Sequence, residues 1–118
     1  MKRITPKPYL SGYPCSLVAV SCALGMIPNG AEEYLTKLRK DGYATLAVSN
    51  RFIRDNLDVK KRVDYKRGQR PKLKELHITG KALVCVYGHL VYVEQETYWS
   101  FFDNEDDDVV TVWFLKED

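Results

Sequence analysis

Two side chains in this sequence have the type and the surroundings that nucleophilic chemistry requires: Cys15 and His89. Cys15 follows Pro14 at the expected start of an apolar helix. A helix N-terminus lowers the pKa of a thiol, because its N–H groups and its dipole favour the thiolate. His89 follows Gly88 and opens an apolar run, where a strand would hold the imidazole rigidly. A thiolate beside an imidazole base is a pair that attacks carbonyl carbon.

The imidazole of such a pair needs an orienting group that accepts a hydrogen bond from its far nitrogen. In an antiparallel hairpin centred near Gln95, a residue just beyond position 101 returns beside position 89. Asp103 is favoured because it directly follows two phenylalanines, and Asn104 is the alternative. The sequence leaves the choice between Asp103 and Asn104 open.

The elements that must position these residues begin with helices in the first half of the chain. Apolar residues cover much of the surface of a helix that starts at Cys15 and ends near residue 27. Charges that match the helix dipole predict a second helix over about 31–40, and a third is expected over about 48–57. The highly charged stretch 58–69 is expected to be a loop or irregular extended chain.

The second half of the chain predicts strands. After Gly80, four apolar runs alternate with polar turn residues; they cover 82–87, 90–94, 97–103 and 109–115. Helices followed by a strand meander predict an α+β fold, with N-terminal helices packed on a C-terminal antiparallel β-sheet. With 118 residues and no linker composition, residues 1–118 are expected to form a single domain.

Composition excludes several classes of protein. Hydrophobic residues make up 45% of the chain and the formal net charge is +2, which is ordinary globular composition. Three cysteines without CxxC spacing argue against a disulfide framework and against a zinc site, so neither a metal nor another cofactor is expected. Cys22 and Cys85 lie inside apolar segments and are expected to be structural. No signal peptide or membrane span is predicted, so a cytoplasmic location is expected.

The order of these residues resembles that of the papain-like cysteine peptidases. The segments that carry the resemblance are YPCSLVAVSCAL, KALVCVYGHLVYVEQ and TYWSFFDN, and the last two are similar to segments of the bacteriocin leader-processing peptidases. The resemblance implies a papain-like fold and a hydrolase with Cys15 as nucleophile, His89 as base and Asp103 as orienting residue. The implied substrate is a peptide, an isopeptide or a peptidoglycan amide.

One position departs from that family. Its members usually have a glutamine a few residues before the cysteine, which donates a hydrogen bond to the oxyanion. This chain has no glutamine there, and Tyr9 is the candidate donor in its place. Loss of such a donor costs about 100- to 1000-fold in rate.

A basic segment offers a different function. Between residues 60 and 74, eight cations face one carboxylate, and the candidate partner-binding residues among them are Lys60, Lys61, Arg62, Lys66, Arg67 and Arg70. The alternative hypothesis is therefore a non-catalytic module that uses this segment to bind an acidic protein or nucleic acid. The acidic stretch after residue 103 has the opposite charge, so mutual attraction of two solvated loops explains the pattern equally well.

Overall fold

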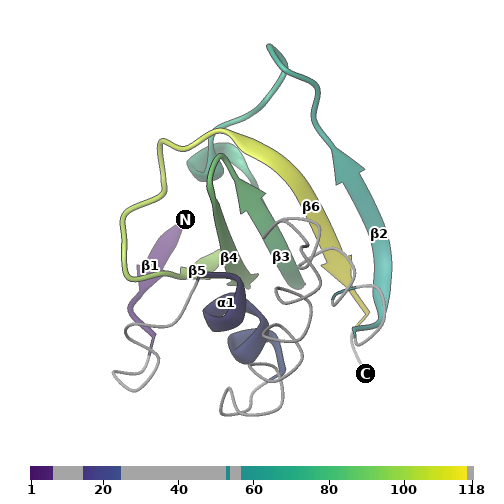
Figure 1. Cartoon of the computed structure of the whole chain (residues 1–118), viewed down its shortest axis with the longest axis vertical. Helices are drawn as coiled ribbons and strands as arrows, with labels where there is room; N and C mark the ends of the chain where they lie inside the picture. The colour runs from purple at the N-terminus through teal and green to yellow at the C-terminus, as the bar shows by residue number, and fades with distance from the viewer. Residues whose placement is uncertain (7–14, 25–52, 54–56, 117–118) are drawn as a thin grey trace, which may run out of the picture.

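A computed structural model of the chain describes residues 1–6, 15–24, 53 and 57–116. In that part of the chain, six strands form one mixed sheet in the order β1-β5-β4-β3-β6-β2 (Figure 1). The helical elements beside it are α1 (Cys15–Leu24) and the 3-10 turn η2 (Leu73–Glu75). The strands are β1 (Lys2–Ile4), β2 (Val59–Asp64), β3 (Lys81–Val86), β4 (His89–Glu94), β5 (Thr97–Trp99) and β6 (Val109–Leu115).

The predicted fold class is wrong. The described residues do not form N-terminal helices on an antiparallel sheet; they form mostly a mixed sheet, in which β1 lies parallel to β5. The N–H of Lys2 donates to the carbonyl of Glu96 (2.9 Å), and the N–H of Ser100 donates to that of Ile4 (3.1 Å). A three-residue edge strand is held by such backbone bonds and has no hydrophobic alternation, so the sequence pattern did not reveal it.

The stretch 58–69, predicted as loop or irregular extended chain, is more regular than expected, because its first half is the edge strand β2. This strand pairs antiparallel with β6, and its middle residues Lys60, Lys61 and Arg62 are exposed. Charged side chains on an edge strand discourage pairing with another chain. High charge therefore indicated solvent exposure here, and it did not exclude a strand.

The predicted helix start at Cys15 is confirmed. The predicted helix over 31–40 lies outside the described residues, and most of that over 48–57 does as well. Within the latter range, Ile53 is helical and fully buried, and its carbonyl accepts a hydrogen bond from the N–H of Leu57 (2.9 Å). In the described part of the chain, no helix combines the length and the apolar character that crossing a membrane requires.

The central strands agree with the sequence pattern to within a residue or two. β3 pairs antiparallel with both β4 and β6, so that Val84 lies opposite Val91 on one side and Val112 on the other. β5 is shorter than predicted, because it ends at Trp99 instead of near position 103. Residues 100–108, between β5 and β6, therefore belong to none of the named strands.

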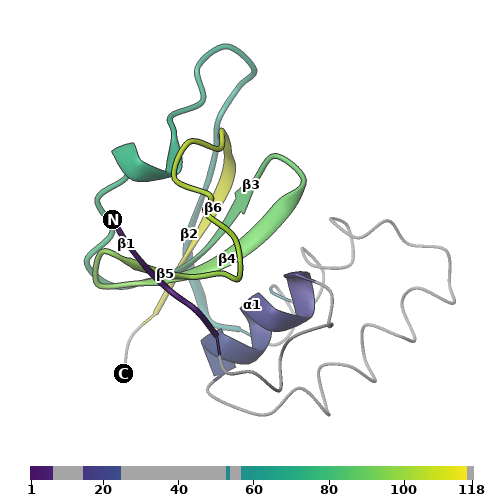
Figure 2. The same cartoon turned by 90° about the vertical axis from the view of Figure 1, so that its left-hand side faces the viewer.

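Each face of the sheet has its own apolar cluster. α1 packs on one face against β3 and β4, and η2 lies on the other (Figure 2). The cluster beneath α1 contains Ala19, Val20, Ile53, Leu83, Cys85, Leu90, Tyr92, Trp113 and Leu115. The opposite cluster contains Leu73, Ile78, Ala82, Val84, Val86, Val91, Val93, Tyr98, Val109 and Val112. Residues buried on alternate faces fix the register of the central strands, since a shift of one residue would exchange the two faces.

Candidate active site

Cys15 is the first residue of α1 and packs, half-buried, against the cluster that contains Cys85 and Leu90. The first four N–H groups of an α-helix have no partner within the helix, so they create positive potential at this end. The thiol therefore lies where the sequence pattern predicted, between the start of a helix and the sheet.

Cys15 and His89 line the same pocket, which has a volume of about 250 Å³. Helix α1 contributes Cys15 and Val18, the start of β4 contributes His89 and Leu90, and the chain at the end of β5 contributes Trp99, Ser100, Phe101 and Phe102. The ring of Phe102 meets the His89 imidazole edge-on, with 5.9 Å between the ring centroids. The fold thus brings the predicted nucleophile and the predicted base to one small, largely aromatic cavity.

The pocket lies at an end of the sheet. Along β4, Leu90 and Tyr92 belong to the cluster beneath α1, whereas Val91 and Val93 belong to the opposite one. Alternation therefore gives His89 the same face as Val91, away from α1. Its imidazole shares a pocket with Cys15 because β4 begins at His89 and its neighbour β5 has already ended.

Ser100 is the polar neighbour of the His89 ring, with its Oγ 3.5 Å from Nε2. The single hydroxyl proton of Ser100 is committed elsewhere, because Oγ donates to Oδ1 of Asn104 at 2.6 Å. Toward His89, Ser100 can therefore only accept a hydrogen bond. This arrangement favours the tautomer that has its proton on Nε2, and it leaves the lone pair of Nδ1 available as a base.

The amide of Asn104 is oriented in turn by Asp107. Its Nδ2 donates to Oδ2 of Asp107 at 2.7 Å, and a carboxylate only accepts, so the amide oxygen must face Ser100. Ser100 and Asn104 are only 2% and 6% exposed, which makes each of these hydrogen bonds costly to lose. A polar chain thus runs from Asp107 through Asn104 and Ser100 to His89.

Asp103, the favoured orienting residue, does not line the pocket. Its Oδ1 accepts hydrogen bonds from the hydroxyl of Tyr98 (3.3 Å) and from the N–H of Glu105 (3.0 Å). The alternative, Asn104, reaches His89 through Ser100.

Sequence reasoning missed Ser100, although a signal was present. The β4–β5 register pairs Tyr92 with Trp99 and Val93 with Tyr98. Continued to position 91, this register places Ser100 opposite Val91, on the same face as His89 and diagonally next to it. In the same register, Asp103 would lie on the opposite face of the sheet. Counting faces along the hairpin would therefore have favoured Ser100 over Asp103 as the polar neighbour of His89.

The two other cysteines are held as neutral thiols. Burial raises the pKa of Cys22 to about 11. Burial likewise raises the pKa of Cys85; the nearby Cys15 raises it further, while Arg70 lowers it. Both were predicted to be structural, and their apolar surroundings oppose formation of the thiolate.

The remaining predicted residues lie away from this pocket or outside the described residues. Tyr9 is outside them. Lys60, Lys61 and Arg62 lie on β2, and Lys66, Arg67 and Arg70 follow in the loop after it. Within the described ranges, no group of three or more His, Cys, Asp or Glu side chains is arranged to hold a metal ion.

The family resemblance stays a prediction. The resemblance lies in the segments YPCSLVAVSCAL, KALVCVYGHLVYVEQ and TYWSFFDN. No protein-family model, no curated protein and no solved structure gives a match to this chain.

Proposed function

We propose that this protein is a cysteine hydrolase of the papain-like type, acting on a peptide or another amide. The observation that supports the proposal is the pocket that Cys15, at the start of α1, shares with His89, at the start of β4. The polar chain behind His89 adds to it, because a base must present an unprotonated nitrogen in a fixed direction.

The reaction proceeds by acyl transfer. Nδ1 of His89 takes the thiol proton of Cys15, and the thiolate sulfur attacks the carbonyl carbon of the substrate. The tetrahedral intermediate collapses to a thioester as the C–N bond breaks, and His89 returns the proton to the leaving amine. Water, deprotonated by His89, then attacks the thioester and releases the acid and the Cys15 thiol. N–H groups of the first turn of α1, together with Tyr9, are the proposed oxyanion donors.

The pocket walls limit the substrate. Trp99, Phe101 and Phe102 provide aromatic surface, and Val18 provides aliphatic surface. A cavity of about 250 Å³ accommodates one apolar side chain or a short acyl group. The proposed substrate therefore presents an uncharged, apolar group beside the scissile amide.

Alkylation of native protein with iodoacetamide, quantified for each cysteine by mass spectrometry, tests the proposal. An ordinary thiol is less than about 1% ionised at about pH 6, whereas a thiolate–imidazolium pair is largely ionised there. We expect Cys15 to react at that pH at least about tenfold faster than a free thiol, and we expect His89→Ala to remove the difference. Cys22 and Cys85 serve as internal references, because burial keeps both protonated.

The matched control is His77→Ala, which removes a histidine whose side chain is 85% exposed and interacts only with Glu96 among the described contacts. This variant should leave the reactivity of Cys15 unchanged. Hydrolysis itself is measured on a pool of internally quenched peptides, in which Cys15→Ser should abolish turnover. A Cys15 thiol that titrates in the ordinary range, whether or not His89 is present, would contradict the proposal.

A further inference from the structure

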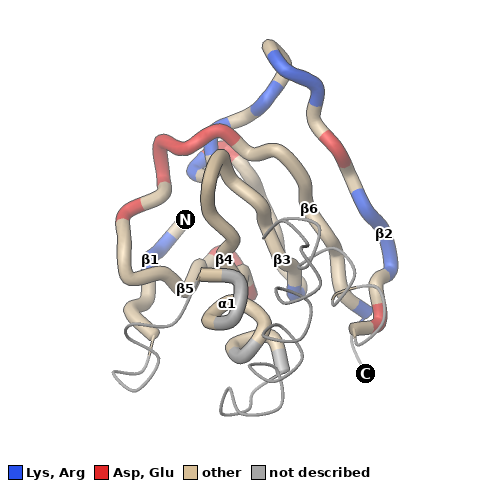
Figure 3. The backbone as a smooth tube through the Cα atoms, in the orientation of Figure 1, with Lys and Arg blue, Asp and Glu red and all other residues tan. Residues whose placement is uncertain are grey.

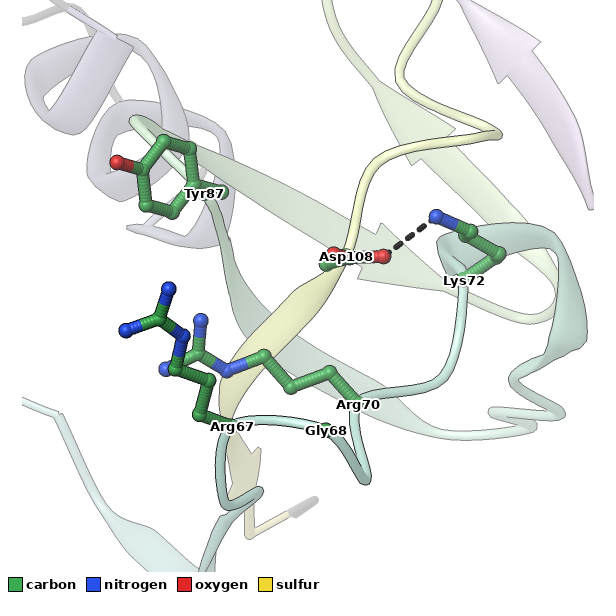
Figure 4. A pocket seen from close by; sticks show the side chains of 6 residues that line it. All are labelled: Arg67, Gly68, Arg70, Lys72, Tyr87 and Asp108. Atoms are coloured by element: carbon green, nitrogen blue, oxygen red, sulfur yellow. Dashed lines mark hydrogen bonds and ion pairs between the residues drawn. The ribbon is translucent and has the colours of Figure 1, made fainter.

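A second and larger pocket, of about 720 Å³, includes Tyr87 of the β3–β4 turn (Figure 4). The loop after β2, the turn itself and the residue before β6 supply its walls: Arg67, Gly68, Arg70, Lys72, Tyr87 and Asp108. Tyr87 lines this pocket and His89 lines the smaller one, with Gly88 between them. The two pockets are thus neighbours built on one turn.

The charges in this pocket do not cancel. Nζ of Lys72 lies 2.6 Å from Oδ1 of Asp108, so these two residues neutralise one another. Among the described residues, neither Arg67 nor Arg70 forms an ion pair. Nε of Arg70 donates to the carbonyl of Tyr65 (3.4 Å), which orients this guanidinium and leaves its two terminal nitrogens for a ligand. Two guanidinium groups in one concave site favour an oxyanion, which each can bind through paired N–H groups.

Tyr87 adds an aromatic surface that the fold does not use. Tyr87 is 78% exposed, which makes it the most exposed large hydrophobic residue in the described part of the chain. The backbone beneath it is fixed, because its N–H donates to the carbonyl of Asp108 (3.0 Å). In Figure 4 the ring lies on the same side of the pocket as the guanidinium groups of Arg67 and Arg70. An aromatic face beside two cations matches a nucleotide, which combines a flat base with a phosphate.

We propose that this pocket binds single-stranded nucleic acid, with a backbone phosphate on Arg67 and Arg70 and a base stacked on Tyr87. A polymer is favoured over a single nucleotide because positive charge continues beyond the pocket. Lys60 and Lys61 are exposed on β2, and the basic residues of β2 and of the loop after it form one edge of the molecule (Figure 3). A basic track with an aromatic platform is the usual device for binding a strand without reading its sequence. Binding here requires neither Cys15 nor His89.

The test is fluorescence anisotropy with a short labelled oligothymidylate and the full chain, at low salt and over a salt series. Arg67→Ala and Arg70→Ala should each weaken binding. The double variant should reduce the slope of log Kd against log salt by about 0.7, the value for one lost phosphate contact, because both arginines hold the same phosphate. Tyr87→Ala should weaken binding by roughly 5- to 150-fold, whereas Tyr87→Phe should retain it, because stacking needs the ring and not the hydroxyl.

The matched control is Lys81→Ala, which makes the same charge change at the opposite end of β3 and should leave affinity nearly unchanged. Cys15→Ser should also leave it unchanged. Thermal melts verify that each variant is folded. We expect Arg67→Ala and Tyr87→Ala to fold normally, because both residues are exposed.

Three results would overturn the inference. The first is a failure to localise binding to this pocket. Either the wild-type protein binds no oligonucleotide at low salt, or Arg67→Ala, Arg70→Ala and Lys81→Ala reduce its affinity equally. The second is binding of thymidine monophosphate as tightly as the oligonucleotide, which would indicate a mononucleotide site. The third is binding of polyglutamate as tightly as the oligonucleotide with no effect of Tyr87→Ala, which would indicate a surface for an acidic protein.

Discussion

At the scale of single residues, the polar neighbour of the His89 ring is a buried serine, and we expect it to orient that ring. Ser100 donates its proton to Asn104, so it offers His89 only an acceptor. Many cysteine hydrolases use a carboxylate or an amide for this purpose. In the mechanism proposed for this protein a hydroxyl would take that place, and the amide of Asn104 and the carboxylate of Asp107 lie one and two hydrogen bonds further away.

Ser100→Ala should lower the free energy of unfolding by about 1–3 kcal/mol, because it leaves the buried amide oxygen of Asn104 without its donor. It should also slow alkylation of Cys15 near neutral pH, since the imidazole loses its acceptor. Urea unfolding gives the first value and mass spectrometry the second.

The control for that substitution is Thr97→Ala, which removes an exposed hydroxyl that donates to the carbonyl of Gln95 at 3.3 Å. We expect a change within about 0.5 kcal/mol and normal reactivity of Cys15. If Ser100→Ala lowered stability and left the pH profile of Cys15 alkylation unchanged, Ser100 would be structural and would not position His89.

At the scale of elements, two tight turns determine which side chains reach the pockets. Gly88 has φ +77° in the β3–β4 turn, a conformation that glycine adopts without steric cost. The β4–β5 turn has the left-handed conformation without glycine, with φ values of 49° at Gln95 and 61° at Glu96. Oε1 of Glu96 is in addition buried without a hydrogen-bond partner among the described residues. Conformational strain therefore differs between two turns of the same length.

Two opposite substitutions test this difference. Glu96→Gly should raise the free energy of unfolding by about 0.5–1 kcal/mol, because it relieves a left-handed residue. Gly88→Ala should lower it by about 1–2 kcal/mol. A Cβ at Gly88 would meet no atom within 4 Å apart from its chain neighbours, so the cost comes from the left-handed backbone and not from contact with the rest of the fold. Thermal unfolding measures both, and a common sign for the two changes would refute the assignment.

At the scale of the whole molecule, the basic and acidic segments partly neutralise one another, as one hypothesis from the sequence stated. Lys72 pairs with Asp108 and Lys74 pairs with Asp106, each at 2.6 Å. The hydrogen bond from Lys74 lowers the pKa of Asp106. The N–H of Leu73 also donates to the carbonyl of Asp107 (3.0 Å), so the acidic loop is fixed by its backbone as well. The cations that remain for a partner lie on β2 and in the loop after it (Figure 3).

Stability should fall at alkaline pH because of Cys22. Its pKa is about 11 in the folded protein and 9.0 ordinarily, so between these values the unfolded chain loses a proton that the folded chain retains. The contribution of Cys22 to the free energy of unfolding then decreases as pH rises, by at most about 1.4 kcal/mol per pH unit, and this contribution is constant below the window.

The raised pKa values of Cys85 and Tyr98 act in the same direction. Urea unfolding across this pH range should therefore show a shallower decline in Cys22→Ala than in the wild type. Identical slopes would show that Cys22 is not desolvated.

The sequence by itself determined the central strands and the start of α1. Strands β3, β4 and β6 are runs of apolar residues that are buried on both faces of the sheet. Such runs can be recognised in the sequence without knowing which strands pair with them. The helix start at Cys15 likewise follows from local features. For the same reason the sequence indicated Cys15 and His89, because each is the first residue of one of these elements.

Only the tertiary structure decided the edges of the sheet and the neighbours of His89. β1 and β2 are strands because adjacent backbones offer them hydrogen bonds, which their own charged residues do not indicate. Ser100 meets His89 because β5 ends at Trp99 and the chain then turns. Arg67, Arg70 and Tyr87 share a pocket because the loop after β2 folds against the β3–β4 turn. Such contacts join residues that are distant in sequence, and the secondary-structure propensity of a short segment cannot predict them.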